Sequence, residues 1–324
     1  MRRVVCREFG HVERLAVEEA ADPVAASGEV VVAVRAAGVT FVDALLCEGR
    51  YQIKPPLPFT PGGEVAGEVV AVGANVTGGC RVGQRVLVSC GVGGFAERLA
   101  VPAEMARRLP PGLTFGQGAA LVQSYATALF ALTRRVAIER DQWVLVLGGG
   151  GGVGLAMIDV ARHLGAHVIA AASSDEKLAA ARDAGAEAGV RYDREDLKAR
   201  VRALSGGGVH VVVDPVGGSY AEPALRTLLP FGQYLIVGFA AGQIPVLKAN
   251  LILLQNRSAV GVDWGAWSFQ NPEENGALIG EVLALAAGGT IQPVEPTAYP
   301  LERAAEALRA LLDRQVAGKI VLVP

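Results

Sequence analysis

The segment Trp143-Val-Leu-Val-Leu147, Gly148-Gly-Gly-Gly-Gly152-Val153-Gly154, Leu155-Ala-Met-Ile-Asp-Val-Ala-Arg-His-Leu164 decides the fold. It predicts a buried strand, a glycine turn and an amphipathic helix. Gly149, Gly151 and Gly154 fit the spacing G-x-G-x-x-G, in which the first glycine allows the sharp turn, the second admits a pyrophosphate to the backbone and the third lets helix and strand pack closely. A ligand-free glycine turn is the alternative. Because a second strand follows at 167–172, we predict a dinucleotide site on the helix N-terminus, where N–H groups favour an anion.

Strands and helical patterns alternate after Trp143. The sequence predicts helices at 175–184, 195–204 and 219–229, and strands at 209–214, 233–237 and 258–262. This alternation is typical of an α/β fold with a doubly wound parallel sheet, a Rossmann dinucleotide-binding domain, which we assign to residues 123–263. Ligands of such sheets bind at the carboxyl ends of the strands.

The remaining residues predict a second, β-rich domain. Short apolar runs separated by glycine and proline occur at 29–35, 65–72, 84–89 and 96–101. After Trp264, helices at 272–287 and 301–313 and a strand at 319–323 break the alternation, and we expect them to return to the first domain. The sequence thus predicts a domain of residues 1–122 and 264–324, with the active site between the two domains.

Composition excludes several classes of partner. The chain has 30 basic and 32 acidic residues, a net charge of −2, which gives no electrostatic reason to bind nucleic acid or an anionic membrane. It starts with charged residues and has no run of 18 apolar residues, so we expect a soluble, cytoplasmic protein. The four cysteines and four histidines are scattered, without a C-x-x-C pair, and predict neither a disulfide framework nor a metal site.

Several further segments carry a family resemblance. They are Ala37-Gly-Val-Thr-Phe-Val-Asp43, Gly49-Arg-Tyr51, Pro58-Phe-Thr-Pro-Gly-Gly-Glu-Val-Ala-Gly67, Gly93-Gly-Phe-Ala-Glu97, Asp214-Pro-Val-Gly-Gly218, Val237-Gly-Phe239 and Gly318-Lys319. With them, the chain resembles the zinc-independent quinone oxidoreductase branch of the medium-chain dehydrogenase/reductase superfamily. The resemblance implies a GroES-like, β-rich catalytic domain beside the Rossmann domain.

The resemblance also implies that no zinc is used. In the zinc alcohol dehydrogenases of this superfamily a cysteine, a histidine and a second cysteine hold the catalytic metal. The matching positions here are Thr40, Gly63 and Gln123, and the first two cannot supply a thiolate or an imidazole. The cysteine-rich lobe for a structural zinc is missing. Glu64 is interpreted as a buried carboxylate that ties the β-rich domain to the nucleotide domain.

The residues after the second strand of the Rossmann domain predict NADPH over NADH. An NAD enzyme usually has an acidic residue about 20 positions after the glycines, where this chain has Ala172. Ser173 and Lys177 suit a 2′-phosphate, and the resemblance adds Tyr192. Asp175 and Glu176 are interpreted as N-terminal helix residues. For the pyrophosphate we expect the following residues to bind: Gly149, Gly151, Gly152, Val153 and Gly154.

Near the nicotinamide, the resemblance points to the cofactor-binding residues Thr127, Val237, Gly238, Phe239 and Lys319. It places Tyr51 at the substrate mouth, and we predict Tyr51 and Thr40 as catalytic, although many quinone reductases carry asparagine in place of Thr40. Tyr51 or a backbone N–H after Val237 would donate to the developing oxyanion. Because the pKa of tyrosine is ordinarily near 10, water is the favoured proton source.

The sequence therefore predicts an NADPH-dependent reductase of quinones or α,β-unsaturated carbonyls. One alternative is an acrylyl-CoA or enoyl-CoA type of thioester reductase, for which Arg134, Arg135 and Arg140 are candidate ligands of the CoA phosphates. Another is a non-catalytic NADPH-binding protein. We expect a homodimer or homotetramer, with the apolar strand 258–262 as an edge for self-pairing.

Overall fold

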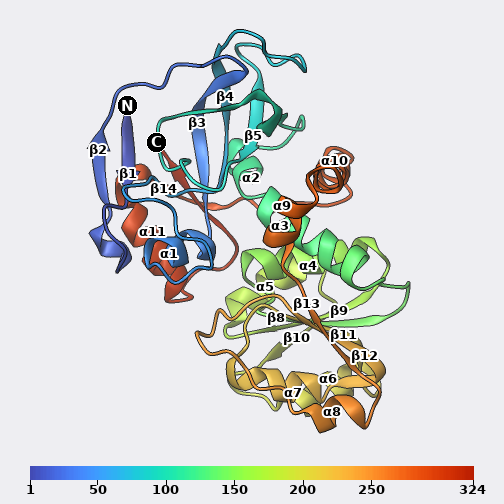
Figure 1. Cartoon of the computed structure of the whole chain (residues 1–324). Helices are drawn as coiled ribbons and strands as arrows, with labels where there is room; N and C mark the ends of the chain where they lie inside the picture. The colour runs from blue at the N-terminus through green and yellow to red at the C-terminus, as the bar shows by residue number, and fades with distance from the viewer. The chain divides into compact units, whose positions relative to one another are not determined.

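The computed structural model describes all 324 residues and divides the chain into two compact units (Figure 1). The first unit consists of Met1–Gln123 and Pro293–Pro324, and the second of Ser124–Gln292. Each unit has its own sheet and its own apolar core.

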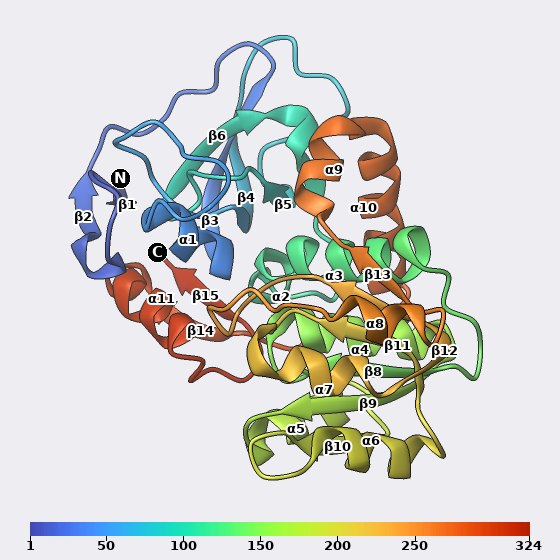
Figure 2. The ribbon, with the colours of Figure 1, turned by 60° about the horizontal axis from the view of Figure 1, so that its bottom comes forward.

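The second unit is built on a six-stranded, entirely parallel sheet with the strand order β10-β9-β8-β11-β12-β13. Figure 2 shows this succession. The strands are β8 (Trp143–Leu147), β9 (His167–Ala172), β10 (Ala188–Arg191), β11 (Val209–Asp214), β12 (Leu228–Ile236) and β13 (Ser258–Gly261). Because parallel strands need crossover connections, helices cover both faces.

Helices α4 (Gly152–His163) and α5 (Asp175–Asp183) lie on one face of this sheet (Figure 1). The other face carries α6 (Leu197–Ser205), α7 (Ala221–Leu225) and α8 (Ala249–Leu253). Side chains of the central strands are fully buried between these layers, among them Leu145, Ile169, Val212 and Tyr234. The predicted doubly wound sheet is confirmed.

Helix α7 is shorter than the predicted helix at 219–229. It ends at Leu225, and β12 begins at Leu228. The backbone N–H of Val209 donates to the carbonyl of Thr227 (3.0 Å), while Thr227 donates back to Ala224 (2.9 Å). Pairing with the neighbouring strand β11 therefore takes the residues that helical periodicity had assigned to α7.

The second unit also includes residues 264–292, which the sequence had placed in the first domain. These residues form α9 (Trp264–Gln270) and α10 (Pro272–Ala287). The ring of Trp267 lies 4.7 Å from that of Phe130 on α3 (Val122–Phe130), and Arg134 pairs with Glu281 at 2.6 Å. The break in the alternation did not mark a return to the first unit, because these helices pack on α3 and the π-helical turn at 131–135 that continues it.

The first unit is built on a seven-stranded sheet. Strands β14-β15-β3-β4-β5-β7 follow in this order, with β6 paired to β3, and every pair but β14–β15 is antiparallel. The strands are β3 (Glu29–Val39), β4 (Glu64–Val72), β5 (Arg85–Ser89), β6 (Arg98–Pro102), β7 (Ala106–Arg108), β14 (Thr297–Pro300) and β15 (Ile320–Val323). The helices are α1 (Phe41–Cys47), α2 (Phe115–Ala119) and α11 (Ala304–Leu312).

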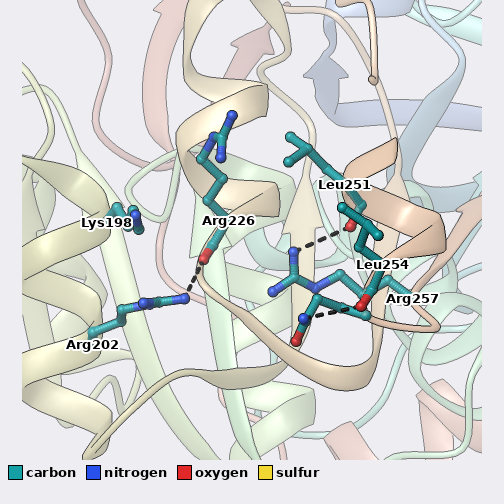
Figure 3. Close-up of a pocket in the computed structure, with 7 residues that line it drawn as sticks. Lys198, Arg202, Arg226, Leu251, Leu254 and Arg257 are labelled. Atoms are coloured by element: carbon teal, nitrogen blue, oxygen red, sulfur yellow. Dashed lines mark hydrogen bonds between the residues drawn. The ribbon is translucent and has the colours of Figure 1, made fainter. Parts of the chain in front are cut away.

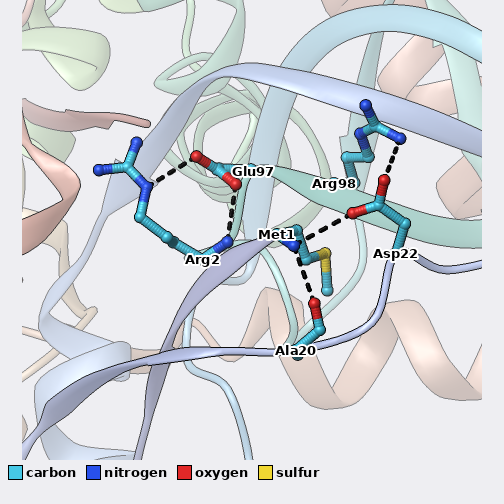
Figure 4. Close-up of polar contacts among 6 residues, drawn as sticks. All are labelled: Met1, Arg2, Ala20, Asp22, Glu97 and Arg98. Atoms are coloured by element: carbon cyan, nitrogen blue, oxygen red, sulfur yellow. Dashed lines mark hydrogen bonds and ion pairs between the residues drawn. The ribbon is translucent and has the colours of Figure 1, made fainter.

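A separate two-stranded ribbon, β1 (Arg2–Val5) and β2 (Ala16–Glu19), begins the chain. Figure 4 shows how its start is attached: the amino group of Met1 donates to the carbonyl of Ala20 at 2.8 Å and pairs with Asp22 at 3.1 Å. Arg2 binds Glu97 through both its backbone N–H and its side chain. Because the carboxylates of these ion pairs are partly exposed to solvent, we expect the pairs to orient the ribbon and to add little stability.

Candidate functional site

The carboxyl ends of the parallel strands bring most of the predicted cofactor residues to one edge of the sheet. The glycine turn follows β8, Ser173 follows β9, Tyr192 follows β10, and Val237 follows β12. Because all six strands point the same way, residues far apart in the sequence share this edge. Ligands of open α/β sheets bind at this edge.

The glycines of the turn have different structural roles. Gly148 has a φ of +59°, so this residue makes the sharp turn that the sequence assigned to Gly149. A Cβ on Gly149 would lie 2.8 Å from the Cβ of Ala170, and one on Gly154 would lie 2.2 Å from the carbonyl oxygen of Gly148. A Cβ on Gly151 would meet only that same oxygen, at 3.5 Å. Gly149 and Gly154 are therefore required for packing, whereas the space beside Gly151 is open.

Helix α4 begins without a side-chain cap. Its N-cap is Gly151, and the N–H groups of Gly152, Val153 and Gly154 have no acceptor within the protein. The helices after the next two strands differ, since Ser174 caps α5 and Asp196 caps α6. Unsatisfied N–H groups at a helix start are an anion site. The turn therefore fits a pyrophosphate, the group that this arrangement binds in dinucleotide-binding folds.

The end of β9 has no acidic side chain at the position that would bind a ribose 2′-hydroxyl. Ala172 is buried, and Ser173 and Ser174 follow it. Lys177 lies in the first turn of α5, and a Cβ added to Gly150 would be 2.4 Å from the Cβ of Lys177. The lysine backbone thus packs directly against the glycine turn.

Tyr192 follows β10, beside Ser173 on the neighbouring strand, since Arg191 is in register with Ala172. Its ring packs against that of Tyr220, with the centroids 4.3 Å apart. One face of Tyr192 is therefore occupied by another aromatic ring. This contact fixes the orientation of the side chain that the resemblance had assigned to the 2′-phosphate.

Sequence reasoning missed Arg191. Its guanidinium pairs with Asp175 at 2.8 Å and with Asp193 at 2.8 Å, and its side chain is only 11% exposed. The pairing lowers the pKa of both carboxyl groups, chiefly through the hydrogen bonds from Arg191. Arg191 thus neutralises Asp175, whose negative charge at the start of α5 would otherwise oppose phosphate binding. The only sequence signal was the neighbouring Tyr192.

The loop after β12 is held by β11. The N–H groups of Val237 and Gly238 both donate to the carbonyl of Asp214, at 2.9 and 3.3 Å, and Ala240 donates to Pro215. The carboxylate of Asp214 accepts the N–H groups of Val216 and Gly217 and the hydroxyl of Tyr234. Of the backbone donors at 237–240, only that of Phe239 is left without an acceptor in the protein, and its side chain is 38% exposed.

In the first unit, Thr40 is the N-cap of α1. Its hydroxyl donates to the carboxylate of Asp43 at 2.7 Å, and Asp43 also accepts the N–H groups of Thr40 and Gly62. Burial raises the pKa of Asp43 to about 6, against the lowering effect of these hydrogen bonds. The hydrogen of the Thr40 hydroxyl is thus already engaged at neutral pH.

Tyr51 lies in the bend after α1, half-buried against the apolar core of the first unit. Its backbone N–H donates to the carbonyl of Leu45 at 3.2 Å. In the second unit, Thr127 lies on α3 between the buried residues Ala126 and Ala128. Both residues are half-buried.

Lys319 pairs with a buried carboxylate. Its ammonium lies 3.0 Å from Glu64, which also accepts the N–H of Gln123, the last residue of the first unit, at 3.0 Å. Both side chains are nearly inaccessible to solvent. Glu64 is therefore a buried carboxylate, as predicted, and it joins β4 to Gln123 and Lys319 within the first unit.

The three positions that match the zinc ligands do not form a metal site. Thr40 is the helix cap, Gly63 has no side chain, and Gln123 is attached to Glu64 through its backbone. In the whole chain, no group of three or more His, Cys, Asp or Glu side chains is placed to hold a metal ion. No helix has the length and apolar character needed to cross a membrane.

The arginines considered for CoA phosphates are engaged elsewhere in the second unit. Arg134 pairs with Glu281, and Arg135 donates to the carbonyl of Gly261 at 2.9 Å. Arg140 packs its side chain over Gly165. Each of the three side chains thus has its own contact, with Glu281, Gly261 or Gly165.

A GroES-like unit and a glycine-turn Rossmann unit in one chain define a dehydrogenase or reductase of the medium-chain type. Residues 26–111 match the alcohol dehydrogenase GroES-like domain, and residues 152–280 match the zinc-binding dehydrogenase family. The quinone oxidoreductase-like protein 2 homolog of Nematostella vectensis is 38% identical over 99% of this chain and 88% of its own length.

Two solved structures show the same architecture over the full chains. Escherichia coli quinone oxidoreductase, determined with NADPH, has a TM-score of 0.89 at 29% identity, with 100% of both chains covered. An NAD-dependent alcohol dehydrogenase reaches 0.90 at 30% identity, again with 100% of both covered. The chain belongs to the quinone oxidoreductase branch of the medium-chain dehydrogenase/reductase superfamily, a family of oxidoreductases. The predicted family and fold are thereby confirmed.

Proposed function

We propose that the protein is a zinc-independent reductase that uses NADPH to reduce a quinone or an α,β-unsaturated carbonyl compound. The observation that carries this proposal is the uncapped start of α4, where three N–H groups and an open space at Gly151 await an anion. NADPH, when bound, supplies a hydride from C4 of its nicotinamide.

The preference for NADPH rests on the ends of β9 and β10. Ala172 offers no acceptor to a ribose 2′-hydroxyl, whereas Ser173, Lys177 and Tyr192 are suited to bind a 2′-phosphate. Arg191 neutralises Asp175, which would otherwise repel that phosphate. Fold similarity alone does not decide the cofactor, because the NAD-dependent neighbour superimposes as well as the NADPH-bound one.

Each expected residue is assigned a part in cofactor binding. Gly149, Gly151, Gly152, Val153 and Gly154 hold the pyrophosphate through backbone donors and close packing. Around the nicotinamide we place the residues Thr127, Val237, Gly238, Phe239 and Lys319. Because Glu64 neutralises Lys319, this lysine acts by hydrogen bonding and position and adds little net charge.

The reaction needs an oxyanion donor and a proton source. Tyr51 and the unengaged N–H of Phe239 are the donors that we assign to the substrate oxygen. Thr40 shapes the site as the cap of α1, and because its hydrogen points to Asp43 it accepts a hydrogen bond from a ligand and does not donate one. The proton comes from water, since an unperturbed tyrosine is a weak acid at neutral pH.

A reductase of this kind requires no zinc. Thr40 and Gly63 cannot act as thiolate or imidazole ligands, so polarisation of an alcohol by a metal has no place in the scheme. Reduction of a conjugated carbonyl by hydride transfer needs only orientation and hydrogen-bond donors. The names of the relatives support a quinone acceptor.

An absorbance assay tests the proposal. Purified protein is mixed with NADPH, or with NADH, and a panel of quinones and enones, and the loss of the reduced-nicotinamide band is followed. We expect turnover with NADPH that survives a metal chelator, together with no stoichiometric zinc by elemental analysis. Cofactor binding without turnover on the whole panel would instead support a non-catalytic NADPH-binding protein.

We also propose that the protein forms a homodimer through β13, with a homotetramer as the larger alternative. β13 is the last strand of its sheet and pairs only with β12, so its outer edge offers unpaired backbone groups. Large apolar side chains are exposed on the paired strand β12 and on the helices before and after β13, at 72% for Phe231, 75% for Leu253 and 76% for Phe269. An exposed apolar surface beside a free strand edge favours self-association.

A further inference from the structure

A second concave site lies at the amino ends of the strands of the Rossmann sheet, whereas the glycine turn lies at their carboxyl ends. A pocket of about 270 Å³ is lined by Lys198, Arg202, Arg226, Leu251, Leu254, Gln255 and Arg257 (Figure 3). Arg257 precedes β13 and donates to the carbonyls of Leu228 and Leu229, which begin β12. The pocket is therefore at the amino ends of the strands, away from the carboxyl edge where the cofactor residues gather.

The charge of the pocket is almost uncompensated. Of its four cations, only Arg226 pairs with a carboxylate, that of Glu222, which Lys248 also shares. Lys198, Arg202 and Arg257 have no acidic partner within ion-pair distance. Lys198 and Arg202 are four residues apart on α6, where like charges repel. The chain as a whole is slightly acidic, so this concentration of positive charge is local.

Arg257 is the most constrained of these cations. It is 9% exposed, and its guanidinium donates only to the backbone carbonyls of Leu228, Leu229 and Leu251. Burial lowers its pKa, as does the nearness of Arg202 and Arg226. Figure 3 shows its guanidinium turned toward the α6 and α7 side of the pocket. A guanidinium has five N–H donors, so three bonds to carbonyls leave two for a bidentate anion.

A purely structural role explains only part of this arrangement. The three bonds of Arg257 attach the start of β12 to α8, and this role accounts for Arg257 alone. It does not account for Lys198 or for Arg202, whose single bond goes to the carbonyl of Arg226 at 3.1 Å. Three cations that have no acidic partner stabilise a bound anion. A phosphate monoester, with a charge near −2, matches their charge best.

The rest of the wall is apolar. Leu251 and Leu254 face the same pocket from α8 and the turn after it, and Leu254 is 70% exposed. An exposed leucine and a half-buried one beside clustered arginines suit a ligand with one charged end and one apolar end. We propose that this pocket binds a small phosphate monoester with an apolar substituent, at a site separate from the proposed dinucleotide site. This inference does not depend on the proposed function.

Phenyl phosphate is the probe that we would use, titrated calorimetrically against the full-length protein in the presence of saturating NADPH. We expect saturable binding, and we expect inorganic phosphate to bind more weakly because it lacks the apolar part. Replacing Lys198→Gln and Arg202→Gln together should weaken phenyl phosphate at least about tenfold, since charge-assisted bonds are lost. Arg202 is exposed and Lys198 half-buried, and neither pairs with an acid, so the variant should fold.

The matched control is Arg200→Gln, a cation on the same helix that pairs with Glu195 outside the pocket. It should leave the affinity unchanged. The proposal is overturned if wild type shows no saturable binding up to about 10 mM, the scale of a very weak complex. It is also overturned if the double variant and wild type bind equally. A change of molar mass by light scattering in the double variant, with phosphate affinity unchanged, would show that the cluster serves contact between copies of the chain and would refute ligand binding.

Discussion

At the scale of single residues, the glycines of the turn serve two different purposes: close packing inside the protein and open space for a ligand. Gly154 has no room for a side chain, because its Cβ would lie 2.2 Å from the carbonyl oxygen of Gly148. Gly151 has room, and any side chain there would enter the space in front of the uncapped α4. A substitution at Gly151 should therefore affect binding, whereas one at Gly154 should affect folding.

Gly151→Val is expected to abolish NADPH binding while the protein stays folded. The added side chain meets only the Gly148 oxygen in the protein, at 3.5 Å from its Cβ, but it occupies the place of the pyrophosphate. Gly154→Ala is the contrast, since its Cβ must displace backbone and should lower the thermal midpoint sharply. Cofactor titration and thermal unfolding of both variants test this. An unchanged NADPH affinity in Gly151→Val would mean that the glycine tract is structural only.

Lys177→Ala is expected to weaken NADPH binding by roughly ten- to a hundredfold, the loss of one charge-assisted bond to a phosphate. NADH binding should hardly change, because NADH has no 2′-phosphate. Ala172→Asp should shift the preference toward NADH, since it adds an acceptor for the 2′-hydroxyl at the end of β9. Both cofactors are titrated against wild type and the two variants. Equal losses for NADPH and NADH in Lys177→Ala would place the lysine outside the phosphate pocket.

At the scale of elements, helix starts and strand ends control the charge of the site. α5 begins with Asp175 next to the expected 2′-phosphate position, and β10 ends in Arg191, which binds that carboxylate. α1 is closed by the reciprocal bonds of Thr40 and Asp43. The pKa of each acidic residue depends on its surroundings: Arg191 on β10 lowers that of Asp175, and burial raises that of Asp43.

Arg191→Gln is expected to weaken NADPH binding and to leave NADH binding nearly unchanged. The substitution removes a cation and uncovers the carboxylates of Asp175 and Asp193 near the phosphate. The double variant Arg191→Gln with Asp175→Asn should recover part of the lost NADPH affinity, because one uncovered charge is gone. Four dissociation constants, for wild type, both single variants and the double variant, give the coupling. Additive effects would show that the ion pair does not influence the cofactor.

Asp43 should make the stability of the first unit depend on pH. Its pKa is raised from 3.8 to about 6 by burial, so the folded chain binds a proton more tightly than the unfolded chain. The free energy of unfolding should therefore fall as the pH rises from about 4 to about 6, by about 3 kcal/mol for a shift of this size. Asp43→Asn removes this titration. Thermal midpoints should show wild type losing stability relative to the variant over that range, and a constant difference would refute the raised pKa.

At the scale of the whole molecule, the chain contains one entirely parallel sheet and one mostly antiparallel sheet. The candidate cofactor residues of the second unit follow the carboxyl ends of its parallel strands, while the first unit buries Glu64 on β4 and Asp43 on α1. Both sheets end in edge strands, β13 in the second unit and β14 in the first. The proposed dimer uses the free edge of β13, since an unpaired strand edge is able to pair with a second copy.

Ala259→Asp on β13 is expected to weaken the proposed dimer. In a symmetric pair the new carboxylates of both copies would come close at the strand edge and repel. Ala298→Asp is the matched control, because Ala298 is also an exposed alanine on an edge strand, β14. Light scattering should show a lower molar mass for Ala259→Asp and no change for Ala298→Asp. Dissociation caused by the control alone would move the interface to the first unit.

The sequence by itself determined the strand, turn and helix at 143–164, because their signals are local: apolar runs, glycine and a period of 3.6 residues. It determined the parallel sheet through the alternation of elements, and it excluded thiolate and imidazole ligands at Thr40 and Gly63 by residue type alone. It also predicted the candidate cofactor residues that follow β8, β9, β10 and β12, since the strand order of a doubly wound sheet brings those strand ends together.

Only the tertiary structure decided what depends on contacts between distant residues. The assignment of α9 and α10 to the second unit follows from packing between Trp267 and Phe130. The neutralisation of Asp175 by Arg191 follows from the pairing of β10 with β9. Lys198 and Arg202 lie near Arg257 because α6 and the segment before β13 meet at the amino ends of the strands. No local pattern encodes such contacts, because charge pairing and burial depend on which elements become neighbours in space.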